Sequence, residues 1–411
     1  MTVKNWQDAP YNRWSFLHLR EVIPTHRIPR SPVPGRAWEV TDRSAELEAV
    51  KVQRLEKGAG TVGEVLADTF TDAVVVVHDG RIVMEQYRGL MRPDTSHLLM
   101  SVSKSLVGCV TGNLVQEGRL EVEKTVDDYV PEIAGSGYSG ARVRDLLDMR
   151  TGAKFSEAYK DPKAEVRVME RHMGWRPGLD EAPLGAYAYL RTLRSEGPHG
   201  GDFTYRSADT DVLGWVCERA AGDRMAHLIA RYLWTPMGAE WDADVTCDCV
   251  GTAIHDGGVS AVIRDLARFG QLLLDDGRCG DRSVVPADWL RAARSLDPDI
   301  RAAFAASDNE PFLPGGWYRN QFWFTPGPSG TVQLCLGIHG QMVLVDRETA
   351  TVAVKYSTWP DPQNPAFLID TIRAFTALGR HLSGLGGEAP RPGSSGAAVH
   401  PKNPGSETGQ D

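Results

Sequence analysis

Ser101 and Lys104 are the two residues whose types and spacing point most directly to chemistry, in the segment Ser101-Val102-Ser103-Lys104. A serine hydroxyl is a weak nucleophile unless a base lies beside it. Residues three apart share one face of a helix, so in a first turn the amine of Lys104 would reach the hydroxyl of Ser101. Burial is expected to lower the pKa of Lys104 and so make it a base, and the unpaired N–H groups of the helix start would face an oxyanion.

The residues around this pair predict that it lies at the start of a buried helix. An apolar segment, 98–100, precedes Ser101, and apolar residues recur at helical spacing over 104–116 before Gly118, the expected stop. A serine and a lysine at this spacing also arise by chance. The alternative is therefore a solvated lysine in an ordinary first turn.

The elements that must position the pair come from both ends of the chain. Two β-rich segments, 73–78 and 81–87, are joined by Asp79-Gly80, a strong hairpin signal. Three further strands, expected to form a meander, and helices with apolar spacing follow. The strands are 332–338, 342–346 and 351–356, and the helices are 211–221, 261–274 and 367–382. This order predicts one antiparallel sheet assembled from the two ends of the chain, with a helical region of about 100–260 inserted.

Composition narrows the class of function. A formal net charge of -9 argues against general nucleic-acid binding, which needs clustered Lys and Arg. No stretch is long and apolar enough for a membrane span, and the first residues lack the pattern of a secretory signal, so we expect a cytoplasmic protein. Six scattered cysteines suit reduced thiols, and Cys247-Asp248-Cys249 lacks a second ligand pair, so no metal is expected.

Three regions are predicted along the chain. Residues 1–45 lack periodicity and look like an irregular arm, residues 46–383 form the main domain, and residues 384–411 have the composition of a disordered tail. The letters of Gly58-Ala59-Gly60-Thr61-Val62-Gly63 fit a dinucleotide loop. The preceding segment, 52–57, is not expected to be a strand, so we interpret the glycines as a plain loop and predict no cofactor.

Five ordered segments resemble the family of class C β-lactamases, D-aminopeptidases and related esterases. They are Leu99 to Leu106 around the Ser-x-x-Lys motif, Leu146 to Gly152, Phe203 to Ser207, Gly257 to Gly270, and Gly337-Ile338-His339-Gly340. The resemblance spans about residues 65–382. It implies an α+β fold of the β-lactamase/transpeptidase type, an antiparallel sheet flanked by helices plus a mainly helical region.

A closer resemblance is to the 6-aminohexanoate-dimer hydrolases, nylon-oligomer hydrolases that also cleave carboxylic esters. It is carried by Asn5 to Pro10, Tyr159 to Pro162 before Gly174-Trp175-Arg176, and Ile338 to Gln341. The resemblance implies Ser101 as the nucleophile, Lys104 as its proton relay and Tyr205 as the donor of a proton to the leaving amine. It also implies that Tyr159 bonds the scissile amide, and that the backbone N–H groups of Ser101 and Ile338 form the oxyanion hole.

Physical reasoning agrees on Tyr205, because a phenol beside a cationic lysine can pass a proton between nucleophile and leaving group. The alternative is a buried aromatic ring whose hydroxyl has a structural partner. For Tyr159 the alternative is a tyrosine on a surface loop.

Substrate contacts are also predicted. In the dimer hydrolases an acidic side chain meets the substrate's ammonium end, and the spacing from Tyr159 assigns that place to Glu170. Asp256 stands near a position that tunes amide activity, although both carboxylates could be ordinary solvated groups. Trp175 and Trp323 are expected to wall the pocket, and His339 lies on the late strand motif.

Two departures weaken an antibiotic-hydrolase function. Cys335-Leu336-Gly337 stands where β-lactamases carry Lys-Thr-Gly, which removes the cationic anchor for a β-lactam carboxylate, and Ser207 stands where the family usually has Asn. We therefore expect a serine hydrolase of small linear amides or esters, with 6-aminohexanoate dimer as the leading amide. The alternatives are a carboxylesterase without amidase activity, a β-lactamase or D-aminopeptidase, and a catalytically silent binding homologue. Whether the chain forms a homodimer is left open.

Overall fold

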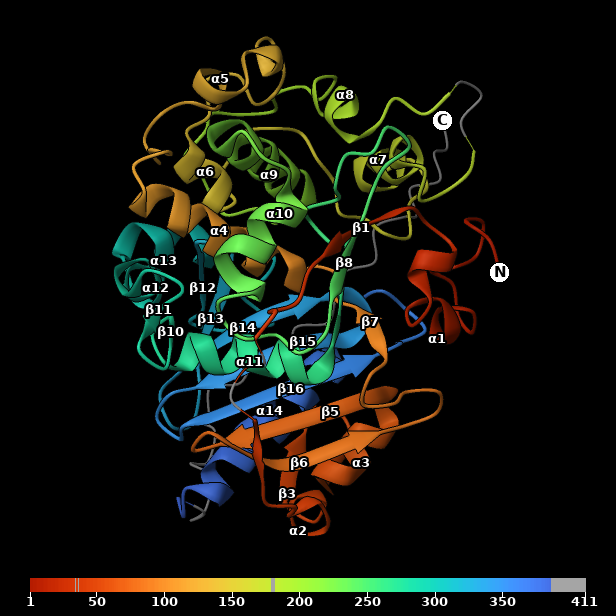
Figure 1. Cartoon of the computed structure of the whole chain (residues 1–411), viewed down its shortest axis with the longest axis vertical. Helices are drawn as coiled ribbons and strands as arrows, with labels where there is room; N and C mark the ends of the chain where they lie inside the picture. Colours follow the sequence, from red (N-terminus) through yellow and green to blue (C-terminus); the bar gives the residue numbers. More distant parts are fainter. Residues whose placement is uncertain (34, 36, 179–181, 386–411) are drawn as a thin grey trace, which may run out of the picture.

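An eight-stranded sheet forms the centre of the computed structural model, which describes residues 1–33, 35, 37–178 and 182–385. Its strand order is β12-β13-β14-β15-β16-β5-β6-β2, and the pairs are antiparallel except β2 with β6 (Figure 1). The strands are β12 (Trp317–Arg319), β13 (Phe322–Pro326), β14 (Thr331–Gly337), β15 (Gln341–Asp346), β16 (Thr351–Ser357), β5 (Thr71–His78), β6 (Arg81–Tyr87) and β2 (Glu39–Val40).

The predicted hairpin and meander are confirmed. Asp79 and Gly80 both have positive φ, 47° and 72°, as a tight turn between twisted strands requires. The pairing of β16 with β5, in which Val354 lies opposite Val75, joins the two ends of the chain into one sheet. The expected fold class, an antiparallel sheet with helices and a mainly helical region, is thereby confirmed.

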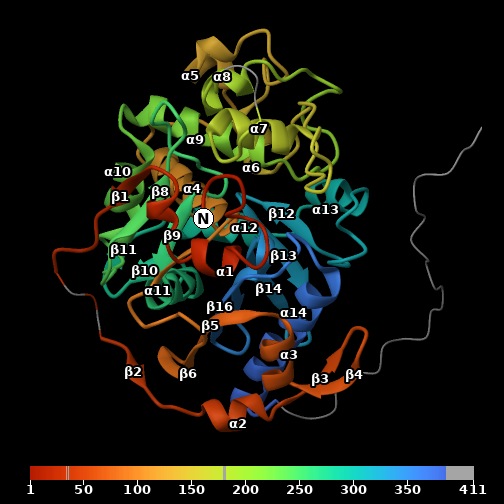
Figure 2. The same ribbon diagram turned by 90° about the vertical axis from the view of Figure 1, so that its right-hand side faces the viewer.

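Helices cover both faces of the sheet (Figure 2). On one face α11 (Ile263–Leu274) packs across β15, β16 and β5, and α4 (Val102–Gln116) lies over β13 to β15. On the other face lie α3 (Val62–Asp68) and α14 (Pro365–Leu382). Because β5 is buried on both faces, it reads as a continuous apolar segment rather than an alternating one.

The helical region lies at one end of the sheet and packs around α4 and α9 (Figure 1). Its elements are α5 (Val126–Tyr129), η2 (Pro131–Ile133), α6 (Val143–Leu147), α7 (Glu165–Met173), α8 (Ala186–Leu190), α9 (Ser207–Ala221), α10 (Met225–Ile229) and η3 (Ala230–Trp234). Two more helices, α12 (Ala287–Arg294) and α13 (Pro298–Ala305), lead into β12. Among the described residues, no helix is both long and apolar enough to cross a membrane.

The structure differs from the local expectations in several places. The segment 1–45 is not uniformly irregular, since it holds α1 (Asn12–Ser15), η1 (Leu19–Glu21), β1 (Thr25–Ile28), β2 and the start of α2 (Ser44–Glu48). A four-stranded sheet of order β1-β8-β9-β7 was not predicted. Its strands β8 (Ala243–Thr246), β9 (Val259–Val262) and β7 (Ser96–Leu98) are short and largely buried, so they show no alternation to detect. The predicted helix 261–274 begins only at Ile263, because β9 includes the residues up to Val262.

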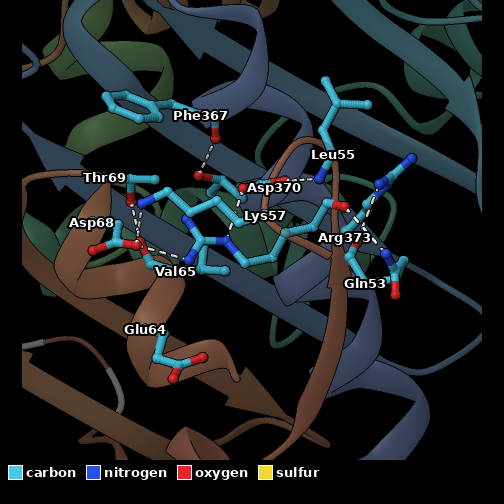
Figure 3. A network of polar contacts seen from close by, with 12 residues as sticks. Gln53, Leu55, Lys57, Glu64, Val65, Asp68, Thr69, Phe367, Asp370 and Arg373 are labelled. Atoms are coloured by element: carbon cyan, nitrogen blue, oxygen red, sulfur yellow. Dashed lines mark hydrogen bonds and ion pairs between the residues drawn. The ribbon is translucent and has the colours of Figure 1, made fainter. Parts of the chain in front are cut away.

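Another expectation was wrong: the segment 52–57 was not expected to form a strand, but residues 52–54 lie in one. β3 (Lys51–Arg54) pairs with β4 (Gly58–Thr61) in a short hairpin that leads into α3. Arg54 fixes this hairpin, because its guanidinium bonds Asp370 of α14 at 3.0 Å and Asp68 of α3 at 2.7 Å. Figure 3 shows these two carboxylates, on α14 and α3. The remaining short elements are η4 (Ile338–Gly340), β10 (Arg278–Cys279) and β11 (Arg282–Ser283). Of the tail predicted from Gly384, residues 386–411 lie outside the described residues.

Candidate active site

Ser101 stands between β7 and α4, where the chain turns from the small sheet into a buried helix. The N–H of Leu99 bonds the carbonyl of Val259 in β9 at 2.8 Å, which fixes the approach to the turn. Met100 has a φ of 49°, in the left-handed region that non-glycine residues rarely adopt. Such strain persists only where the surroundings enforce it, and it clusters at functional sites. The turn therefore holds Ser101 at the head of α4 in a constrained position.

Lys104, one turn into α4, brings its amine to the hydroxyl of Ser101. The side chain is 1 % exposed, and Nζ lies 3.0 Å from Ser101 Oγ, 3.2 Å from Ser207 Oγ and 2.7 Å from the carbonyl oxygen of Asp256. These contacts use all three donors of an ammonium group. The predicted contact across the first helical turn is therefore present.

The protonation expected for Lys104 is corrected by its surroundings. Burial lowers the pKa of Lys104, but the negative charge of Tyr205, Asp256, Glu157 and Asp211 outweighs burial and leaves the pKa above its ordinary value. One carboxylate oxygen of Asp256 lies 3.6 Å from Nζ. Lys104 is thus an ammonium at neutral pH, a hydrogen-bond donor to Ser101 rather than a ready base.

Tyr205 completes the group from a different part of the chain, just before α9. Lys104 Nζ lies 5.3 Å from the centre of the Tyr205 ring, and the Ser101 hydroxyl is near enough to the Tyr205 phenol to lower its pKa. Burial raises the pKa of Tyr205, and the opposing effects of Lys104 and Ser101 do not cancel it. Hydroxyl, amine and phenol therefore meet in one place, as the sequence predicted.

The backbone N–H groups predicted for the oxyanion hole belong to Ser101 and Ile338. In the part of the chain that the structure describes, neither N–H donates a hydrogen bond, and both residues line the same cleft. Gly337 lets the two segments approach, because a Cβ there would stand 2.6 Å from the carbonyl oxygen of Leu99. The turn after Ile338 is held by His339, whose φ is 61°.

A cleft of about 400 Å³ opens beside Ser101. Its walls combine the predicted polar residues with apolar side chains of α7. They are Gln7, Met100, Ser101, Tyr159, Val166, Met169, Glu170, Met173, Trp175, Asp256, Gly257 and Ile338. The predicted contacts Tyr159, Glu170, Trp175 and Asp256 thus share one cleft with Ser101.

Two predicted contacts lie elsewhere. Trp323 is absent from the cleft wall and instead stacks on Tyr205, with ring centroids 5.1 Å apart. The ring of His339 is buried, and its Nδ1 lies 2.7 Å from the carbonyl oxygen of Trp359. Burial lowers the pKa of His339 to about 4, so the ring is neutral. Both side chains are buried, Trp323 from β13 and His339 from η4.

Glu157 is a residue of the site that the sequence did not reveal. Its Oε1 accepts the backbone N–H of Ser207 at 2.5 Å, and its Oε2 accepts the hydroxyl of Tyr159. Burial raises the pKa of Glu157, and Lys104 opposes that shift only in part. Its position two residues before Tyr159 was the only available signal.

The two residues that depart from the family pattern, Ser207 and Cys335, both lie in ordered parts of the structure. Ser207, at the usual Asn position, accepts a hydrogen bond from Lys104, so it takes part in the polar contacts of the site. Cys335 is buried in β14 and supplies no cationic anchor. Among the described residues, no group of three His, Cys, Asp or Glu side chains is arranged to hold a metal ion.

Comparisons with known proteins found a family model and several relatives that match this chain. A family model described as Beta-lactamase matches residues 62–377. The chain is 39% identical over 384 residues to the 6-aminohexanoate-dimer hydrolase of Paenarthrobacter ureafaciens, covering 92% of this chain and 95% of that protein. It is 26% identical over 265 residues to esterase EstB of Burkholderia gladioli, covering 58% of this chain and 66% of EstB.

A solved structure extends the similarity to the whole fold. The structure of a Bacillus anthracis protein, provisionally described as a 6-aminohexanoate-dimer hydrolase, matches with a TM-score of 0.86 and 26% identity. The match covers 94% of this chain and 98% of that chain. The similarity therefore includes the N-terminal segment as well as the sheet and the helical region.

Proposed function

This chain belongs to the Beta-lactamase family, and we propose that Ser101 is its nucleophile in the hydrolysis of linear amides and esters through an acyl-enzyme. The protein is a serine hydrolase. The observation that carries the assignment to Ser101 is the convergence of its hydroxyl with the Lys104 amine, 3.0 Å away, and with the Tyr205 phenol. Ser101 and Lys104 lie at the start of α4, and the fold brings Tyr205 to them from the segment before α9.

In the acylation step the Ser101 oxygen attacks the substrate carbonyl carbon and its proton passes to the Tyr205 oxygen. The reactive state holds Tyr205 as a phenolate beside the Lys104 ammonium, which stabilises it. The carbonyl oxygen becomes an oxyanion that the N–H groups of Ser101 and Ile338 bind. Tyr205 then gives the proton to the leaving nitrogen or oxygen, the C–N or C–O bond breaks, and the acyl group stays on Ser101.

In deacylation a water molecule attacks the acyl group, and Ser101 becomes the leaving group. Tyr205 takes a proton from the water molecule, whose oxygen attacks the acyl carbon, and the same N–H groups hold the second oxyanion. When the ester bond to Ser101 breaks, the proton returns to the Ser101 oxygen. The product is a carboxylic acid.

We propose 6-aminohexanoate dimer as the amide to test first, because the relative at 39% identity carries that activity in its name. A carboxylesterase without amidase activity is the second candidate, supported by the similarity to EstB. A β-lactam substrate would find no lysine at Cys335. Amine release from the dimer separates amidase from esterase.

Replacing Ser101 with alanine is the direct test of the nucleophile. Turnover of a chromogenic butyrate ester should fall by at least about 10³-fold in kcat/KM, as it does when a covalent nucleophile is removed. Ser139→Ala, on an exposed loop, is the matched control and should keep full turnover. Ester turnover that persists in Ser101→Ala would refute the nucleophile, and failure of wild type to react with a serine-directed phosphonate would leave a binding homologue.

We also propose a cytoplasmic location. All six cysteines are unpaired, and four of them, Cys109, Cys217, Cys247 and Cys335, are buried thiols, which is typical of proteins in a reducing compartment. Cell fractionation of the native host tests this, and recovery outside the cytoplasm would contradict it.

A further inference from the structure

The N-terminal segment from Asn12 to Phe16 packs against two parts of the chain that lead into the candidate active site. It consists of the short helix α1 and Phe16, and we call it the 12–16 segment. It lies outside residues 62–377, which the family model matches. Asn12 and Phe16 are both 0% exposed, and neither lines the cleft beside Ser101. Their side chains are therefore not expected to touch the substrate.

The first part of the chain that the 12–16 segment contacts leads to Ser101. The backbone carbonyl of Phe16 accepts the N–H of Leu98, the last residue of β7, at 2.9 Å. The rings of Phe16 and His97 meet edge to face, with centroids 5.8 Å apart and planes at 88°. Ser101 follows Leu98 by three residues. The 12–16 segment thus helps to fix the approach of the chain to the nucleophile and its N–H.

The second part is the turn after β14, which carries the N–H of Ile338. The rings of Phe16 and His339 meet edge to face, with centroids 5.3 Å apart and planes at 85°. His339 Nδ1 lies 2.7 Å from the carbonyl oxygen of Trp359, and because a carbonyl can only accept, Nδ1 carries the proton. Asn12 Nδ2 donates to the same carbonyl oxygen at 3.1 Å. The 12–16 segment therefore contacts both the ring of His339 and the acceptor of that ring.

The turn at His339 is bonded closely to the segment 359–362. The N–H of His339 donates to the carbonyl of Pro362 at 2.8 Å, and its carbonyl accepts the N–H of Trp359 at 3.2 Å. A Cβ at Gly340, whose φ is 91°, would lie 2.3 Å from the Trp359 ring. The position of Ile338 therefore follows that of the segment 359–362, to which Asn12 is bonded.

We propose, on the basis of the function proposed above, that Asn12 and Phe16 are positioning residues for the oxyanion hole. Phe16 contacts the chain before Ser101 and the turn after Ile338, so it couples the positions of the two N–H groups. Donors stabilise an oxyanion only when they lie about 3 Å from it, and a misplacement of about 1 Å costs on the order of 10²-fold in rate. Packed side chains that do not touch the substrate supply this precision.

Phe16→Leu tests the coupling, because leucine keeps an apolar side chain at this position but removes both edge-to-face contacts. Acylation and deacylation both pass through an oxyanion, so kcat/KM for a chromogenic hexanoate ester should fall by at least about tenfold. Pentylboronic acid, whose adduct with a serine places an oxygen in an oxyanion hole, should lose affinity to a similar extent. Hexanol, which has no such oxygen, should inhibit the variant as it inhibits wild type.

Phe375→Leu is the matched control, because Phe375 is also 0% exposed but lies in α14, on the other face of the sheet. It should leave the ester kinetics and the boronate affinity unchanged. An equal loss in this control, or a loss of hexanol affinity as large as the loss of boronate affinity, would show a general loosening of the core and would contradict the inference.

Asn12→Ala removes one hydrogen bond without the loss of a ring, so it decides the question if Phe16→Leu does not fold. It should also lower kcat/KM and boronate affinity by about tenfold. In either variant the amides of residues 336–341 should exchange hydrogen for deuterium faster than in wild type, while those of α12 should not.

The exchange measurement needs no turnover. If wild type cleaves no ester and binds no boronate, the proposed function fails, and the exchange rates alone decide whether the 12–16 segment holds the turn. Unchanged exchange over 336–341 overturns the inference, as do unchanged kcat/KM and boronate affinity in both variants of an active enzyme.

Discussion

At the scale of single residues, the site is governed by anionic and acidic groups gathered around one lysine. Asp256 lies 3.6 Å from the Lys104 amine, and Glu157 and Asp211 act on it from farther away. They keep the pKa of Lys104 above its ordinary value despite burial, which alone would lower it. Because burial also raises the pKa of Tyr205, the pair loses its proton only at alkaline pH.

Turnover, measured as kcat/KM, should therefore rise with pH through the neutral range. In Asp256→Asn the lost negative charge lowers the pKa of both Lys104 and Tyr205, because Asp256 raises both. The rising limb of log kcat/KM against pH should shift to lower pH by about one unit. A full pH profile of ester hydrolysis, recorded for wild type and Asp256→Asn, measures this shift.

Asp94→Asn, an exposed carboxylate away from the site, is the control and should leave the profile in place. A shift of the limb to higher pH in Asp256→Asn would show that Asp256 does not act through its charge.

At the scale of elements, α4 is positioned by a turn that reaches it from the far end of the chain. The turn between β12 and β13, Asn320-Gln321, has positive φ at both residues, 52° and 68°. The side chain of Gln321 bonds Thr210 of α9 at 2.8 Å and the carbonyl of Leu146 in α6 at 2.9 Å. The turn thus holds α4, α6 and α9 together beneath the candidate active site.

Gly108 is the point where α4 touches this turn, and Gly108→Ala tests the contact. A Cβ at Gly108 would lie 2.5 Å from the carbonyl oxygen of Asn320. Alanine improves helix propensity by about 1 kcal/mol, but overpacking against a backbone atom costs about 1–3 kcal/mol. We expect a net loss of up to about 2 kcal/mol in the free energy of unfolding and reduced kcat/KM.

Denaturant unfolding and ester kinetics measure both effects. Gly197→Ala is the control, since a Cβ at Gly197 would meet no atom within 4 Å, and it should be close to neutral. A Gly108→Ala protein as stable and active as wild type would show that α4 has room to move.

At the scale of the whole molecule, the sheet carries a buried lysine far from the candidate active site. Lys355 in β16 is fully buried and donates to Thr69 Oγ1 at 2.7 Å and to Thr371 Oγ1 at 3.3 Å. Thr69 and its neighbour Asp68 lie beside α14 (Figure 3). Burial lowers the pKa of Lys355 to about 7, although Asp72 opposes the shift.

This lysine makes stability depend on pH with a definite sign. Between pH 7 and about 10.5 the unfolded chain binds a proton that the folded protein does not, so stability rises with pH. Below pH 7 the folded state must bury the charge. Lys355→Met should therefore stabilise the protein by a few kcal/mol at pH 6 and by much less at pH 9.5.

Denaturant unfolding of wild type and Lys355→Met at both pH values measures this gain in the free energy of unfolding. The other titrating groups are the same in both proteins, so their contributions cancel when the two free energies are subtracted. Lys4→Met, an exposed lysine, should show no such dependence. A gain that is equal at both pH values would mean that burial does not lower the pKa of Lys355 in the folded protein.

Much of the arrangement was determined by local sequence. The nucleophile segment, the Asp79-Gly80 hairpin, the meander up to β16 and the helix α14 all follow from periodicity and turn chemistry within a few residues. The contact of Ser101 with Lys104 followed from helical spacing. The approach of Tyr205 to this pair followed from a resemblance, because no local rule brings residues a hundred positions apart together.

The tertiary structure alone decided the charges. The proton on Lys104 depends on Asp256, and Glu170 accepts a hydrogen bond from Gln7, in each case a partner more than a hundred residues away. The burial of the Trp323 and His339 side chains, and the pairing of β1 with β8, were likewise set by packing. Electrostatic energies act through space, so a sequence that names the ionisable groups leaves open which of them are charged and which are already paired.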